Sequence, residues 1–137
     1  MIVLGVLYEY ETPVKLANAY LKMVLQAIKW ESAYKPKRYG HITLYRKWIK
    51  KLPENTVWED DVTKSLIDEI LNLISSKNEL LDCNMSGINR KTQQEPSPYM
   101  EIIKIAKSKN IRLVYGADVH ESINVAQGYQ EFLEIGD

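Results

Sequence analysis

Apolar positions along the chain alternate between short continuous runs and stripes with helical spacing. Runs rich in apolar and β-branched residues predict strands at 2–7, 38–44, 80–84 and 111–115. Between them, helical spacing predicts helices at about 13–30, 62–76, 98–110 and 122–133, with a short helix at 44–51. Strands that alternate with helices favour parallel pairing and right-handed crossovers. The pattern therefore predicts one α/β domain over 1–137, a partial (β/α) barrel of about four βα units or a small open sheet.

Capping signals place the beginnings of three helices. Thr12-Pro13 and Ser97-Pro98 each combine an N-cap residue with a proline suited to the first helical position. Asp60 or Asp61 can cap the helix between them. On the core side of the first helix we expect Leu16, Tyr20, Met23 and Ala27, with Leu21, Val24, Leu25 and Ile28 widening the apolar stripe. In the second helix we expect Leu66, Ile67, Ile70, Leu71 and Ile74 on the core face, and the three tryptophans, Trp30, Trp48 and Trp58, are expected in the core or in helix packing.

Composition narrows the class of protein. The 137 residues hold 18 Lys and Arg against 18 Asp and Glu, so the formal net charge is zero. A neutral domain lacks the overall attraction of a nucleic-acid or membrane-surface binder. The longest apolar run, 1–8, is far shorter than the roughly 20 residues that cross a bilayer and lacks the features of a secretory signal. The single cysteine, Cys83, cannot form an internal disulfide, which suits a cytoplasmic protein.

Charge is distributed unevenly along this neutral chain. Seven basic residues and no acidic residue lie between Lys35 and Lys51, whereas 118–137 holds five acidic residues and no Lys or Arg. Such runs are typical of solvated faces. The basic run also suits an anion, and a small phosphate fits a neutral domain better than nucleic acid does.

Polar residues follow the predicted strands, where β/α proteins carry their chemistry. His41, the pair Asp82 and Asn84, and the pair Asp118 and His120 all lie near strand ends. His41, Asp118 and His120 form an N/N/O set that suits Zn, Mn or Fe. They also suit structural roles, since Asp118 can cap the last helix or hold an Asx turn. Asn84 and Ser86 are candidates for substrate binding and also suit a plain turn after a strand, and Cys83 suits a small buried residue.

Three stretches together resemble the histidinol-phosphatases of the polymerase-and-histidinol-phosphatase (PHP) superfamily. They are Tyr34-Lys-Pro-Lys-Arg-Tyr-Gly-His-Ile-Thr-Leu-Tyr-Arg-Lys-Trp48, Leu81-Asp-Cys-Asn-Met-Ser-Gly87, and Pro96-Ser-Pro-Tyr followed by a helix and Ile111-Arg-Leu-Val-Tyr-Gly-Ala-Asp-Val-His120. Their order and spacing resemble the C-terminal half of that family over roughly 12–129. The resemblance implies part of a distorted (β/α)7 barrel that hydrolyses L-histidinol phosphate in histidine biosynthesis with divalent metals, of which Zn, Fe and Mn are the known types.

The resemblance also implies roles for individual residues. His41, Asp118 and His120 match metal ligands of the family, Arg46 matches an arginine that contacts the phosphate, and Arg90 matches a second one. Leu7 stands where the family has another histidine ligand. We therefore expect a metal-dependent phosphoesterase of this type, as a truncated copy with reduced or no activity alone. One alternative is a non-catalytic remnant or partner that binds a phosphate compound or a protein. Another is an intact metal-dependent phosphoesterase with a different substrate.

The expected partial barrel also predicts an assembly. Its outer strands would present open edges, and parallel strands are normally covered on both faces. We expect a homo-oligomer, or pairing with a complementary N-terminal half. The expected ligand is a small phosphate ester, with neither nucleic acid nor membrane as a partner.

Overall fold

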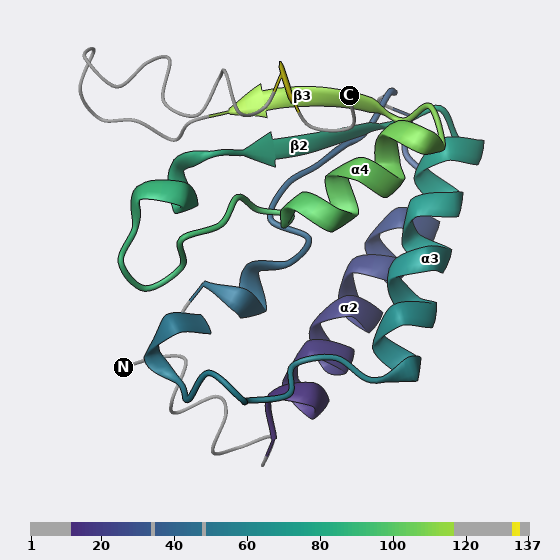
Figure 1. The fold of residues 1–137 in the computed structure, drawn as a ribbon. Coiled ribbons are helices and arrows are strands. Elements are labelled where there is room, and N and C mark those ends of the chain that lie inside the picture. Colours follow the sequence, from purple (N-terminus) through teal and green to yellow (C-terminus); the bar gives the residue numbers. More distant parts are fainter. Residues whose placement is uncertain (1–11, 34, 48, 117–132, 135–137) are drawn as a thin grey trace.

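The computed structural model describes residues 12–33, 35–47, 49–116 and 133–134 (Figure 1). In chain order the helices and strands are α2 (Pro13–Lys29), β1 (Arg38–Tyr39), α3 (Asp61–Ser76), β2 (Leu80–Asn84), α4 (Met100–Ser108) and β3 (Arg112–Gly116). Short 3-10 turns occupy Leu44–Arg46, Ile49–Lys51 and Ser86–Asn89. The three strands form a parallel sheet in the order β1-β2-β3, with α3 and α4 as crossovers. The predicted α/β class is confirmed, and the predicted strand at 2–7 lies outside the described residues.

The helices lie together on one side of the sheet (Figure 1). One core unites them with the strands, and its largest fully buried side chains include Leu21, Ile28, Ile70, Ile74 and Leu81. All five apolar residues expected on the core face of α3 are buried. The described helices also lack the length and apolar character needed to cross a membrane.

Two of the three predicted helix starts are confirmed. The Thr12 hydroxyl accepts a hydrogen bond from the Lys15 amide at 3.1 Å. Asp60 accepts one from the Thr63 amide at 2.9 Å, and the Thr63 hydroxyl accepts one from the Asp60 amide at 3.1 Å, which completes a capping box. The third prediction is wrong: α4 begins at Met100 after Tyr99. Ser97 instead forms an antiparallel bridge with Asn84. Its carbonyl, which an N-cap would use for the first helical hydrogen bond, accepts one from the Asn84 amide at 2.9 Å.

The segment after β1 differs most from the prediction. The strand expected over 38–44 has two residues, because His41 adopts a left-handed φ of 55° and the chain turns there. The short helix expected over 44–51 is two separate 3-10 turns. Met23 and Ala27 on α2, and Trp30 directly after it, are exposed rather than buried as predicted. The buried stripe of α2 runs through Ala17 and the predicted residues Leu16, Leu21, Leu25 and Ile28. Trp58 is buried as expected, and Trp48 lies outside the described residues.

Candidate functional site

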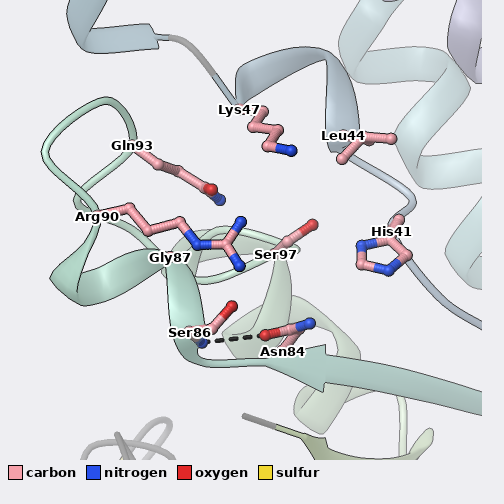
Figure 2. Close-up of a pocket in the computed structure, with 9 residues that line it drawn as sticks. All are labelled: His41, Leu44, Lys47, Asn84, Ser86, Gly87, Arg90, Gln93 and Ser97. Carbon is pink, nitrogen blue, oxygen red and sulfur yellow. Dashed lines mark hydrogen bonds between the residues drawn. The ribbon is translucent and has the colours of Figure 1, made fainter. Parts of the chain in front are cut away.

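A pocket of about 280 Å³ opens at the carboxyl end of the sheet. We call it the cationic pocket. One wall is the turn after β1, and the other wall is the end of β2 with the loop that follows (Figure 2). The lining residues are His41, Leu44, Lys47, Asn84, Ser86, Gly87, Arg90, Gln93 and Ser97. The fold thus brings together four of the seven predicted site residues, which are His41, Asn84, Ser86 and Arg90.

His41 is held at the rim by its backbone. Its carbonyl accepts hydrogen bonds from the Tyr20 hydroxyl at 2.5 Å and from the Leu44 amide at 3.1 Å. The positive φ places a non-glycine residue in a conformation that costs free energy, and such residues cluster at functional sites. Gly40, just before it, allows the chain to pass close to β2, since a Cβ there would lie 3.3 Å from Asp82 Oδ2.

The floor of the pocket is a tight turn after β2. The Asn84 side-chain oxygen accepts a hydrogen bond from the Ser86 amide at 3.0 Å, which is an Asx turn (Figure 2). The Asn84 and Ser97 backbones bond each other in both directions at 2.9 Å, which ties the returning loop to the strand. Gly87 lies beneath that loop, where a Cβ would stand 2.2 Å from the Glu95 carbonyl oxygen. Asn84 and Ser86 therefore shape the turn as well as lining the pocket.

The charge of the lining is positive. Lys47 and Arg90 extend into the space between the two walls, and the His41 imidazole lies on the side of the pocket opposite Arg90 (Figure 2). The nine lining residues include no carboxylate, whereas Asn, Gln and Ser side chains supply neutral hydrogen-bonding groups. Two cations with several neutral donors form a suitable site for a compact anion.

Arg46 has a different environment from the other predicted residues. It does not line the cationic pocket, and its side chain is 15% exposed. Its Nε donates to Glu95 Oε1 at 2.7 Å and its Nη2 to Glu95 Oε2 at 3.1 Å. Burial opposes the charge, but the hydrogen bonds and charges of Glu95 and Glu59 together raise the pKa of Arg46.

The basic run of 35–51 divides between structural and pocket positions. Lys37 donates to the Ala27 carbonyl at 3.0 Å and so caps the end of α2. Arg38 pairs with Asp82, and Lys35 pairs with Glu31 at 3.0 Å. Lys47 alone of the seven lines the cationic pocket. Most of the run therefore fits the solvated or structural interpretation, and one member fits the anion interpretation.

A metal site is not complete within the described residues. Of the three expected ligands, His41 lines the cationic pocket, whereas Asp118 and His120 lie outside the described residues. Across 12–33, 35–47, 49–116 and 133–134, no three His, Cys, Asp or Glu side chains lie close enough to hold a metal ion. These residues alone thus provide a single imidazole, which does not make a metal site.

Cys83 is buried on β2 beside Met85 and Ile103. Burial raises the pKa of its thiol to about 12. A thiol with so high a pKa is protonated at neutral pH and is a poor nucleophile. This agrees with the prediction that it is a small buried residue.

Three polar lining residues, Lys47, Gln93 and Ser97, are not among the predicted site residues. In the sequence, Lys47 is one member of a basic run, and Ser97 carries the signal of a helix cap. Gln93 lies in a loop without periodicity and is only 6% exposed. Lys47 and Ser97 lie in stretches that carry the family resemblance, which could have marked them as site residues. Whether their side chains face the pocket depends on how the loops fold.

Comparisons with known proteins confirm the resemblance to histidinol-phosphatases. The chain is 41% identical over 103 residues to the histidinol-phosphatase of Bacillus subtilis, an alignment that covers 74% of this chain and 37% of that protein. The crystal structure of a Listeria monocytogenes protein assigned as a histidinol phosphatase, HisK, superposes with a TM-score of 0.81 at 29% identity, covering 89% of this chain and 45% of that one. No family model matches the chain. The chain thus spans less than half the length of these two relatives.

Proposed function

We propose that the cationic pocket binds the phosphate group of a small phosphate ester in a phosphoesterase of histidinol-phosphatase type. The observation that supports this most is the lining itself, in which Lys47 and Arg90 face one cavity with the hydroxyls of Ser86 and Ser97 and without a carboxylate. Preorganised cations that face a phosphoryl group stabilise the charge that develops on its oxygens during hydrolysis. The similarity to a histidinol-phosphatase makes L-histidinol phosphate the ester to test first.

We further propose that His41, Asp118 and His120 bind a divalent metal, Zn, Mn or Fe. When bound, such an ion lowers the pKa of a coordinated water and neutralises phosphoryl charge. Within this chain, His41 would supply one imidazole from the pocket rim, while Lys47 and Arg90 hold and orient the phosphate. Because the described residues do not form the site alone, turnover would depend on ligands beyond them.

We also propose that the chain works as a homo-oligomer or with a complementary N-terminal half. In support, the described helices lie on one face of the parallel sheet, and such sheets are normally covered on both faces (Figure 1). The chain also spans less than half of the relatives above. Sedimentation at micromolar concentration tests the homo-oligomer, and a monomer would contradict it.

The hydrolysis test uses the purified chain with added Mn²⁺ or Zn²⁺ and L-histidinol phosphate, and measures the release of inorganic phosphate. We expect release to fall in Arg90→Ala and in His120→Ala. Arg112→Ala is the matched control, since Arg112 lies at the opposite end of β3 and donates to the Asn78 carbonyl. Phosphate binding without release would favour the non-catalytic alternative. If the chain neither binds phosphate nor releases it from the ester, both the phosphoesterase and the non-catalytic alternative are contradicted.

A further inference from the structure

We propose that Arg46 is a positioning residue that clamps the two walls of the cationic pocket together, and that it does not bind the phosphate itself. This inference rests on the proposed phosphate site. It concerns a cluster of four side chains beside the pocket, which are Arg46, Glu59, Glu95 and Tyr99.

The cluster surrounds the Arg46 guanidinium. Glu95 takes the Nε and Nη2 edge in a bidentate pair at 2.7 and 3.1 Å, and Glu59 lies 3.5 Å from Nη1. The Tyr99 ring lies against the guanidinium, with its centroid 4.3 Å from Cζ. The Tyr99 hydroxyl also donates to Glu59. A phosphate at Arg46 would therefore have to displace a bidentate carboxylate.

The positions of Arg46 and Glu95 in the chain explain how this pair can act on the pocket. Arg46 directly precedes Lys47, which belongs to the wall formed after β1. Glu95 lies between Gln93 and Ser97, which belong to the opposite wall. The bidentate pair thus fixes the separation between Lys47 and the loop that carries the other lining residues.

Two further contacts join the same walls more weakly. The Lys50 amide donates to the Thr92 carbonyl at 2.9 Å, and the Thr43 and Ser97 hydroxyls lie 3.5 Å apart. A backbone bond and a long hydroxyl contact tolerate changes of direction better than a bidentate ion pair does. The Arg46–Glu95 pair is thus the contact that specifies the geometry.

Glu95→Gln distinguishes positioning from direct binding by the sign of its effect. If Arg46 bound phosphate, removal of the competing carboxylate would free the guanidinium and tighten phosphate binding. If Arg46 positions the walls, the loss of the charged bidentate pair loosens them and weakens binding. Glutamine keeps the size of the side chain, so packing changes little.

The experiment is a calorimetric titration of the full chain with inorganic phosphate at low salt. We expect about a tenfold loss of affinity in Glu95→Gln and Arg46→Ala, the order of one charge-assisted hydrogen bond. Arg46→Lys should not restore it, because an ammonium cannot make the bidentate pair. Arg112→Ala, with the same loss of charge, should bind like the wild type. Equal or tighter binding in Glu95→Gln would overturn the inference alone, whereas a wild-type chain that binds no phosphate would overturn the proposed function with it.

Discussion

The helix layer and the cationic pocket are built on different principles. The layer of α2, α3 and α4 buries aliphatic side chains at helical spacing, and its cohesion comes from removal of apolar surface from water. The pocket is built from turns after strands, a left-handed histidine and an Asx turn, and it gathers cations. The helix layer thus supplies stability, whereas the pocket combines local strain with two cations at the place where we propose that phosphate binds.

The largest expected effect on the helix layer comes from a substitution that leaves a cavity at its centre. Ile70→Ala removes a fully buried side chain from α3 and should lower the free energy of unfolding by about 3 kcal/mol. Val62→Ala in the same helix, at a side chain 51% exposed, should change it by less than about 0.5 kcal/mol. Urea denaturation measures both. Phosphate affinity of the folded fraction of Ile70→Ala should stay unchanged, and a parallel loss would contradict the separation of the two regions.

Gly87→Ala should harm the pocket and the fold together. The new Cβ would lie 2.2 Å from the Glu95 carbonyl oxygen and 2.6 Å from Gln93 Nε2, so the loop over the floor must move. We expect a loss of about 2 kcal/mol in stability, typical of overpacking, with weaker phosphate binding. Gly116→Ala is the control, because a Cβ there meets no atom of the described residues within 4 Å. Equal effects of the two changes, in urea denaturation and phosphate titration, would refute the role of Gly87.

The helix layer and the cationic pocket also differ in how well the sequence predicts them. The core face of α3 and the span of β2 agree with the structure, because periodicity reports burial directly. The end of β1 could not be predicted, since the left-handed φ of His41 depends on long-range contacts such as the hydroxyl of Tyr20. Ser97 carries a local capping signal, but in the structure it forms a bridge with Asn84, which is distant in the sequence. The family resemblance predicted His41 and Arg90 as site residues, and the polar positions after β2 predicted Asn84 and Ser86; all four line the pocket.

Alkaline pH should lower the free energy of unfolding, because two buried groups then lose their protons more readily in the unfolded chain than in the folded one. Burial raises the pKa of Cys83 to about 12 and that of the Tyr45 hydroxyl above its usual range. Both groups favour the protonated form when folded, so their contribution is complete below the unfolded pKa values, about 8.5 and 10, and is lost as pH rises above them. Each group should contribute a slope of up to about 1.4 kcal/mol per pH unit. Urea denaturation from pH 7 to 11 measures the decline, and Cys83→Ala should make it shallower above pH 9; an unchanged slope would contradict this.

The smallest expected effect concerns the hydroxyls of two tyrosines, Tyr45 and Tyr99. The Tyr45 hydroxyl is buried without a hydrogen-bond partner among the described residues, while its ring packs against Tyr20 and Trp58. Tyr45→Phe should therefore raise the free energy of unfolding by about 1 kcal/mol. Tyr99→Phe should lower it by a similar amount, because its hydroxyl donates to Glu59. Thermal unfolding checks the two signs, and a loss of stability in Tyr45→Phe would show that its hydroxyl has a partner.

The most direct test of the central claim is a phosphate titration of the wild-type chain beside Lys47→Ala, Arg90→Ala and Arg112→Ala. If the cationic pocket binds phosphate, the first two variants should each lose about tenfold or more in affinity, and binding should weaken as salt is raised. Arg112→Ala should bind as the wild type does. Equal binding by all four proteins would contradict the account, because the anion site would then lie elsewhere in the molecule.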